Sequence, residues 1–328
     1  MKLEPSLWFD EVVKTYHLIS PHIHHTQLVT CPDLNEELGG RYLFKPESLQ
    51  ITGSFKVRGA LSAISRLSKD ELKRGVIAYS SGNHAQGVAH AAKVFNTPAT
   101  VVMPKDAPER KIANARALGA EVIFYDRRSE SREEISVEIA KEKNLVIINP
   151  YDALETIYGQ GTAAYEVIHD ANNPKLDNAI ICAGGGGLTA GSCISIKHIN
   201  PGCNVYTAEP EEWNDHQLSF EKNDRVSMDT NRGGLCDGLL TPTPGKIPFA
   251  INTHFGVKGL SVCDQGVCNA MKFAFDRLNL KLEPSGAVAL ACLLENKEKF
   301  KSSRTLIMLS GGNVDEKTFS DCLAKASP

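Results

Sequence analysis

Between residues 75 and 150 the sequence alternates strictly between short apolar runs and stretches with helical spacing. The runs GVIAYSS, ATVVMP, EVIFYD and LVIINP have the length of buried strands, and stretches such as GNHAQGVAHAAKVF separate them. Short apolar strands that alternate with helices indicate a parallel sheet with helices on its faces. The pattern predicts an α/β unit that closes near residue 150.

A second alternating set follows, with the apolar runs NAIICAG, NVYTAEP and TLIMLS, and the run RYLFKPES precedes both sets. The chain is therefore predicted to be α/β, with two open, twisted, mostly parallel sheets flanked by helices. A small domain over residues 76–149 is inserted into a larger domain made of residues 1–75 and 150–328. Residues 210–255 are rich in Asn, Asp, Gly, Pro and Thr and are predicted to be irregular.

The composition gives no reason to expect nucleic acid or a membrane as partner. The net charge is −3, and the sequence has no apolar run of the roughly 20 residues that span a bilayer. The first residues include acidic side chains and no apolar signal-peptide core, so a cytoplasmic location is expected. The nine cysteines include no CxxC pair, which indicates reduced thiols.

Four consecutive glycines, Gly184 to Gly187, follow an apolar strand and precede a helical pattern. Backbone N–H groups in such a turn can face one anion, and the helix N-terminus adds partial positive charge. A phosphate fits this arrangement; a flexible turn is the alternative. Neither a Walker loop nor the full dinucleotide fingerprint is present.

Lys56 lies between Phe55 and Val57 in the stretch SLQITGSFKVRGA, at the start of a predicted helix. Burial and the positive end of the helix both disfavour an ammonium, so the pKa of Lys56 is expected to fall. A neutral lysine is a nucleophile toward aldehydes; a surface lysine packed along Phe55 is the alternative. Together with a phosphate site, the lysine suggests pyridoxal phosphate, held as a Schiff base.

The ordered motifs of the chain resemble those of the serine/threonine dehydratase and serine racemase family. These motifs are SLQITGSFKVRGA, SSGNHAQGVAHAAK, GQGTAAYEV, GGGGL, EPSGAVALA and LSGGNVD, and the resemblance extends over about residues 20–315. The family consists of pyridoxal-phosphate enzymes of the tryptophan-synthase β-like fold. The resemblance implies this cofactor and a small α/β domain set into a larger one.

The resemblance also implies roles for individual residues. Lys56 would hold the cofactor and act as the base on one face of the substrate Cα. Asn83 would bond to the phenolic oxygen, and Ser310, a hydroxyl that leaves the pyridine nitrogen unprotonated, would favour loss of a β leaving group. The other implied cofactor contacts are Phe55, Gly184, Gly185, Gly186, Gly187, Leu188 and Glu283. The loop implied to bind the substrate carboxylate contains Ser80, Ser81, Asn83 and His84.

Two residues bear on which reaction occurs. Ser81 matches the serine that serine racemases carry as a second base, although a helix N-cap suits its position too. Arg132 matches an arginine that reaches toward the substrate side chain, although a solvated arginine beside Glu133 is the alternative. An inward-facing Arg132 would pair with a second carboxylate, which keeps 3-hydroxyaspartate open as a substrate.

A metal site is implied in the stretch AEPEEWNDHQ. Glu209 and Asp215 match carboxylates that hold Mg²⁺ or Ca²⁺ in relatives, with the Trp213 carbonyl as a third ligand. Oxygen ligands suit these ions and Mn²⁺; an acidic loop is the alternative. The stretch HIHH, residues 22–25, has no accompanying carboxylate or cysteine and is not expected to bind a metal.

The sequence thus predicts a pyridoxal-phosphate-dependent ammonia-lyase that converts serine, threonine or threo-3-hydroxyaspartate to a 2-oxo acid and ammonia, with serine racemisation as an additional activity. Serine racemisation as the main activity, β-replacement, and cofactor binding without catalysis are the alternatives. The segment NPYDAL, with Tyr151, departs from the common family pattern and leaves the substrate open. A homodimer is implied by the resemblance alone.

Overall fold

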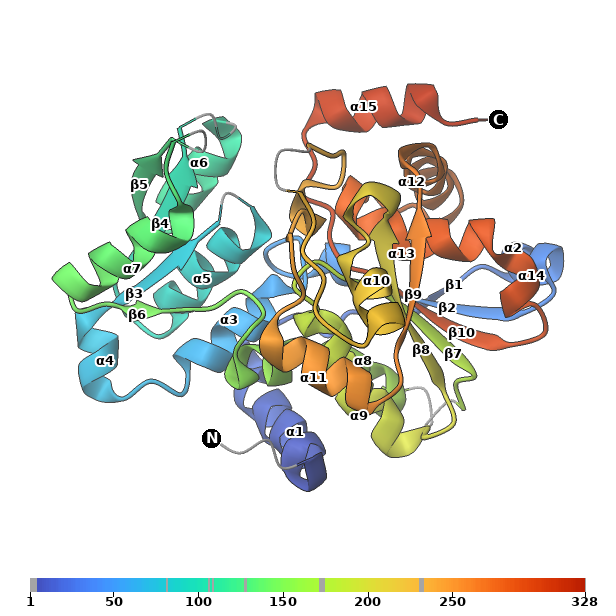
Figure 1. Ribbon diagram of the computed structural model, residues 1–328, viewed down its shortest axis with the longest axis horizontal. Helices are drawn as coiled ribbons and strands as arrows, with labels where there is room; N and C mark the ends of the chain where they lie inside the picture. Colours follow the sequence, from blue (N-terminus) through green and yellow to red (C-terminus); the bar gives the residue numbers. More distant parts are fainter. Residues whose placement is uncertain are drawn as a thin grey trace.

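The computed structural model describes residues 5–80, 82–105, 107, 109–126, 129–170, 175–229 and 233–327. These residues form two open sheets with helices on both faces (Figure 1). The larger sheet has the order β1-β2-β10-β7-β8-β9, in which β1 alone is antiparallel to its neighbour. Its strands are β1 Val29–Thr30, β2 Arg41–Pro46, β7 Asn178–Cys182, β8 Asn204–Pro210, β9 Lys258–Val262 and β10 Arg304–Leu309.

The smaller sheet is parallel throughout, in the order β5-β4-β3-β6. Its strands are β3 Val76–Tyr79, β4 Ala99–Pro104, β5 Glu121–Tyr125 and β6 Val146–Ile147. The predicted fold class is confirmed. The first strand of this sheet begins at Val76 and the last ends at Ile147, close to the predicted domain boundaries at 76 and 149. The division into domains stays a prediction.

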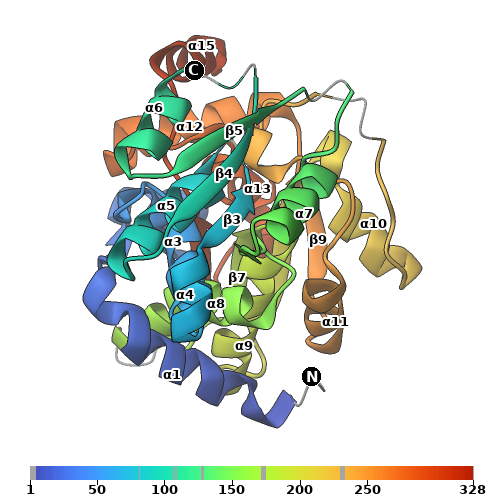
Figure 2. The ribbon, with the colours of Figure 1, turned by 90° about the vertical axis from the view of Figure 1, so that its left-hand side faces the viewer.

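The α-helices cover the sheets and connect their parallel strands. They are α1 Trp8–Ile19, α2 Pro32–Leu38, α3 Lys56–Ile64, α4 Lys69–Arg74, α5 Asn83–Val94, α6 Glu109–Ala117, α7 Arg132–Glu142, α8 Leu154–Asp170, α9 Gly187–Ile199, α10 Asp215–Lys222, α11 Lys246–His254, α12 Asp264–Leu278, α13 Pro284–Glu295, α14 Lys297–Phe300 and α15 Glu316–Lys325. Helix α13 packs on β7, β8 and β10, while α1 lies across α8 and α9 (Figure 2).

Close helix packing explains the glycines of the motif GQGTAAYEV in α8. A Cβ added to Gly159 would collide with the carbonyl oxygen of Arg58 in α3, and one added to Gly161 would lie 2.6 Å from that of Gly191 in α9. Glycine therefore lets α8 contact α3 and α9 backbone to backbone, which brings the start of α3 close to the start of α9.

The prediction that residues 210–255 are irregular is wrong in part, because α10 and α11 both lie there. The N-terminal amides of each helix bond to a carboxylate that lies outside the helix. Glu209 accepts hydrogen bonds from the amides of His216 and Gln217, and Asp152 accepts from those of Lys246 and Ile247. The N-cap residues themselves, Asn214 and Gly245, make no side-chain cap hydrogen bond.

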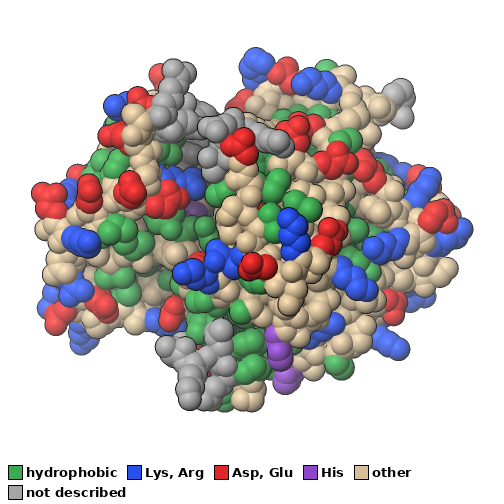
Figure 3. Space-filling model, viewed as in Figure 1, with side chains coloured by type: hydrophobic (Ala, Val, Ile, Leu, Met, Phe, Trp, Pro, Cys, Tyr) green, Lys and Arg blue, Asp and Glu red, His purple; other side chains and the backbone are tan. Residues whose placement is uncertain are grey.

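Charged side chains of both signs are interspersed over the face seen in Figure 3, which agrees with the small net charge. Within the described ranges, no helix combines the length and the apolar character needed to cross a membrane.

Candidate active site

One cavity brings together residues that the sequence predicts to bind cofactor and substrate. It lies at the carboxyl ends of β7 and β10, where open α/β sheets bind ligands. The predicted cofactor residues that line it are Phe55, Lys56, Asn83, Gly184, Gly185, Gly186, Gly187, Leu188, Glu283 and Ser310. The predicted substrate residues that line it are Ser80, Asn83, His84 and Arg132. Ser81 lies outside the described residues.

Lys56 is the first residue of α3, and its side chain is half-buried at the cavity wall. Its Nζ donates a hydrogen bond of 3.0 Å to the carbonyl oxygen of Pro150. Burial lowers the pKa of Lys56 from 10.5 to about 8. The amine therefore has the properties of a nucleophile toward an aldehyde.

Backbone contacts fix the residues that precede Lys56. The Phe55 amide donates to the carbonyl oxygen of Ser310 at 3.2 Å, and Ser54 forms an antiparallel bridge with Gly311. The start of α3 is thereby tied to the end of β10, so Lys56 and Ser310 face one cavity.

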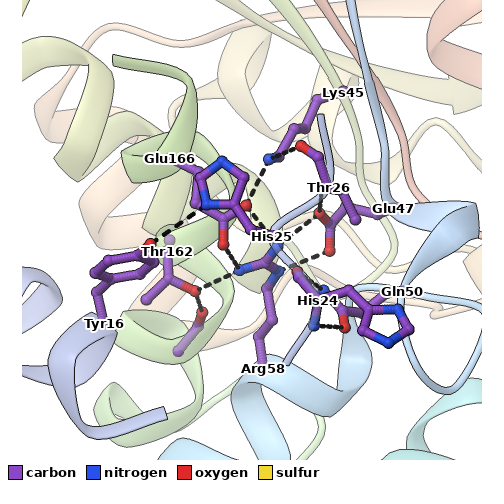
Figure 4. A network of polar contacts seen from close by, with 12 residues as sticks. Tyr16, His24, His25, Thr26, Lys45, Glu47, Gln50, Arg58, Thr162 and Glu166 are labelled. Carbon is purple, nitrogen blue, oxygen red and sulfur yellow. Dashed lines mark hydrogen bonds and ion pairs between the residues drawn. The ribbon is translucent and has the colours of Figure 1, made fainter. Parts of the chain in front are cut away.

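Two residues after Lys56, Arg58 joins a buried network of four charged side chains (Figure 4). Its guanidinium donates at 2.7 and 2.9 Å both to Glu47, just after β2, and to Glu166 in α8. Lys45 donates to Glu166 at 2.5 Å, and all four residues are at most 1% exposed. Two positive and two negative charges balance, so α3, β2 and α8 are joined with no net buried charge.

The glycine loop, defined as Gly184–Gly187, connects β7 to α9. In the described part of the chain, the amides of its first three residues donate to no protein acceptor. Gly186 has φ +87°, a left-handed conformation that favours glycine. A Cβ at Gly185 would collide with Tyr151. Unused amides beside the N-terminus of α9 fit a phosphate, so the loop and Lys56 together fit a phosphate ester that carries an aldehyde.

Asn83, the first residue of α5, has a fixed amide. Its Nδ2 donates to Glu283 at 2.6 Å, and its Oδ1 accepts from Asn313 at 2.7 Å. Asn313 also donates to the carbonyl oxygen of Thr52 at 2.7 Å. The second N–H of Asn83 is fixed in direction by these bonds and suits an oxygen ligand in the cavity.

Ser310 follows β10 and is buried, and Cys182 at the end of β7 lines the same cavity. Burial raises the pKa of Cys182 to about 11, so the thiol stays protonated. Ser310 and Cys182 are therefore both neutral, and the contact of Ser310 with a ring nitrogen stays a prediction.

The N-terminus of α5 carries the residues predicted to bind a carboxylate. His84 donates from Nε2 to the carbonyl oxygen of Ile148 at 2.8 Å, and burial together with Lys56 lowers its pKa to about 3. His84 is therefore neutral. The Ser80 hydroxyl accepts from the Gly82 amide at 3.1 Å. The amides of this helix end favour an anion.

Arg132, the first residue of α7, lines the cavity, so the structure places it near the predicted substrate residues. Its Nε donates to Glu133 at 2.8 Å, and its guanidinium lies 5.9 Å from the centre of the Tyr79 ring. Burial raises the pKa of Tyr79 to about 12, so this ring stays neutral. Tyr79, Tyr151 and Arg132 all line the cavity and contribute one cation and two phenols to it.

Glu209 and Asp215 form a buried acid pair at the start of α10. Glu209 accepts from the amides of His216 at 2.8 Å and Gln217 at 2.9 Å, whereas both Asp215 carboxylate oxygens lack a hydrogen-bond partner among the described residues. Burial raises the pKa of Asp215 to about 8. An unpartnered buried carboxylate beside a second one fits a hard cation. Trp213 stands two residues before Asp215 and is buried, and its indole N–H donates a hydrogen bond to the carbonyl oxygen of Gly233.

The described part of the chain contains no group of three or more His, Cys, Asp or Glu side chains that could hold a metal ion. The HIHH histidines have separate contacts: His22 packs on Phe95, the His24 amide donates to Gln50, and His25 contacts Tyr16.

Sequence reasoning missed Gln160 and His216. Gln160 lines the cavity and donates to the same Pro150 oxygen as Lys56, at 3.0 Å. His216 donates from Nε2 to the carbonyl oxygen of Gly184 at 2.9 Å. Gln160 stands in the motif GQGTAAYEV, which offered a signal, but no local pattern marks His216.

Comparisons with known proteins agree with one another. Residues 19–311 match the family described as "Pyridoxal-phosphate dependent enzyme". The chain is 39% identical over 317 residues to serine racemase of Schizosaccharomyces pombe, which covers 97% of each chain. It is 38% identical over 316 residues to L-threo-3-hydroxyaspartate ammonia-lyase of Saccharomyces cerevisiae, which covers 96% of each. The solved structure of maize serine racemase matches with a TM-score of 0.90 and 33% identity, over 97% of both chains.

Proposed function

The chain belongs to the pyridoxal-phosphate-dependent enzymes of the serine racemase and hydroxy amino acid ammonia-lyase family, and we propose that it is an ammonia-lyase for small L-hydroxy amino acids. The products are a 2-oxo acid and ammonia. The observation that carries this proposal is Lys56, a half-buried lysine with a pKa of about 8 that shares its cavity with the glycine loop.

We expect the glycine loop and Leu188 to hold the cofactor phosphate, and Lys56 to hold its aldehyde group. Asn83 and Ser310 would bond to the ring substituents, Phe55 would pack on the ring, and Glu283 would hold Asn83 in place. When bound, the cofactor supplies an aldehyde for the substrate amine and a conjugated ring that makes the Cα proton acidic.

Lys56 is proposed to take the Cα proton. This requires the neutral amine, because an ammonium has no lone pair. The depressed pKa supplies that form near pH 8, and the bond to Pro150 leaves the lone pair available. The amides at the start of α5 would hold the substrate carboxylate, which fixes the Cα beside Nζ.

Arg132 supports a substrate with a second carboxylate. Its guanidinium can pair with a carboxylate through two parallel hydrogen bonds. The only anion bonded to it within the described ranges is Glu133, on the exposed side of α7. We therefore propose L-threo-3-hydroxyaspartate as the preferred substrate over serine.

Serine racemisation is the second candidate. It needs a proton donor on the face opposite Lys56, and Ser81 is the predicted one. The support for this candidate is the 39% identity to serine racemase of Schizosaccharomyces pombe. The test is release of 2-oxo acid and ammonia from L-serine, L-threonine and L-threo-3-hydroxyaspartate, with chiral analysis of the remaining serine. Keto acid in excess over D-serine supports the lyase, and the reverse ratio supports the racemase.

We further propose that Glu209 and Asp215 bind Mg²⁺, because both oxygens of the buried Asp215 carboxyl group lack a hydrogen-bond partner within the described ranges and a divalent cation would stabilise the charged form. Wild-type protein should melt several degrees higher in millimolar Mg²⁺ than in EDTA. Asp215→Asn should lose most of this difference, whereas Asp276→Asn, on the exposed face of α12, should keep it. An equal Mg²⁺ effect in both variants would contradict the site.

A further inference from the structure

His216 contacts both the acid pair and the glycine loop. It is the second residue of α10, directly after Asp215, and its side chain is fully buried. Its backbone amide donates to Glu209 at 2.8 Å, and its Nε2 donates to the carbonyl oxygen of Gly184 at 2.9 Å. One residue therefore joins two sites that lie on different elements.

The ring also packs directly against the loop. A Cβ added to Gly186 would collide with His216 Cε1, so no space separates the ring from the residue that precedes α9. A shift of α10 would therefore press on the loop or open a gap beside it, and close-packed interiors resist both changes.

The bond to Gly184 fixes the direction of one peptide unit. In a trans peptide the C=O and the next N–H point in opposite directions. Because the Gly184 oxygen points at His216, the Gly185 amide points away from it. That amide donates to no acceptor in the described part of the protein. The bond thus holds a free donor in a defined orientation.

We propose that His216 couples cation binding at Glu209 and Asp215 to phosphate binding at the glycine loop. The inference rests on the proposed function, since it concerns the proposed cation and the family's cofactor. A cation between the two carboxylates would fix the first turn of α10, and with it the ring that orients the Gly185 amide. Each ligand then favours the conformation that the other needs.

The test is the affinity of the apoprotein for pyridoxal phosphate, measured by absorbance titration in Mg²⁺ and in EDTA. In the wild-type protein we expect pyridoxal phosphate to bind about 5- to 20-fold more tightly in Mg²⁺ than in EDTA. The cofactor should increase the affinity for Mg²⁺ by the same factor, which calorimetry with and without cofactor measures. In His216→Leu, and in the smaller His216→Asn, the affinities in Mg²⁺ and in EDTA should differ by less than about twofold. His216→Gln, whose amide offers an N–H donor, should restore most of the wild-type factor.

Ser219→Ala is the matched control, because Ser219 is also buried in α10 but bonds to the Asp215 carbonyl oxygen and the Val226 amide, not to the loop. It should keep the wild-type factor. Independent binding of the two ligands in wild type, or an undiminished factor in both His216→Leu and His216→Asn, would overturn the coupling and leave the proposed function intact. Failure of the wild-type protein to bind cofactor or Mg²⁺ would overturn the corresponding part of the proposed function and the coupling with it.

Discussion

At the scale of single residues, the chemistry depends on one amine that its surroundings keep partly neutral. Lys56 is bordered by Phe55, neutral His84 and neutral Cys182, and no acidic side chain in the described part of the protein bonds to it. Desolvation therefore dominates and lowers the pKa of Lys56 to about 8.

The first prediction concerns pH. At pH 8 about half of Lys56 should be neutral, against about 0.3% of a lysine with the ordinary pKa of 10.5. Since only the neutral amine attacks an aldehyde, the rate of cofactor attachment to the apoprotein should rise from pH 6 and level off above about 8. Stopped-flow absorbance measures this rate. A rate that continues to rise tenfold per pH unit up to pH 10 would show an unperturbed lysine.

The second prediction concerns Arg132. Replacing it with Leu should lower kcat/KM for L-threo-3-hydroxyaspartate by about 30-fold or more, because the second carboxylate loses a charged partner. The value for L-serine should change less than about threefold. The control is Glu133→Gln, which removes the acid that Arg132 contacts and should leave both values near wild type. Equal losses for both substrates in Arg132→Leu would assign Arg132 a structural role only.

At the scale of elements, the glycine loop and α9 form the anion site. Gly186→Ala should weaken cofactor affinity at least tenfold, because a side chain is strained at φ +87° and collides with His216. Gly202→Ala is the matched control, because an added Cβ there meets nothing within 4 Å. Equilibrium titration compares the two. Similar affinities would show that the loop tolerates a side chain and does not shape the site.

The sequence predicts elements well where the signal is local. Alternating apolar runs predict both sheets, and the glycines and Lys56 in its apolar helix predict the main parts of the site. Helices α10 and α11 were missed; they lie in a segment rich in turn-forming residues, and their first amides bond not to the N-cap residues but to Glu209, seven residues from His216, and to Asp152, 95 residues from Ile247. His216 was missed for a related reason: its bond to Gly184 spans 32 residues and exists only in the folded chain.

At the scale of the whole molecule, the network around Arg58 joins the larger sheet to the helix that begins with Lys56 (Figure 4). Its charges are fully buried, so loss of one anion leaves a cation uncompensated. Glu166→Gln should lower the free energy of unfolding by about 3–5 kcal/mol.

Urea denaturation of Glu166→Gln against Lys272→Met checks this value. Lys272 forms an exposed pair with Asp276 at 2.7 Å, and its loss should change the free energy of unfolding by less than about 0.5 kcal/mol. Equal, small effects would mean that water reaches the network and that it does not hold α3 in place.

The most direct measurement for the whole account is borohydride reduction of the protein loaded with pyridoxal phosphate, followed by peptide mass spectrometry. We predict one modified peptide, with the pyridoxyl phosphate group on Lys56, and none from Lys56→Ala. Modification of a different lysine, or no modification at all in a protein that binds the cofactor, would contradict the assignment of Lys56 and the chemistry derived from it.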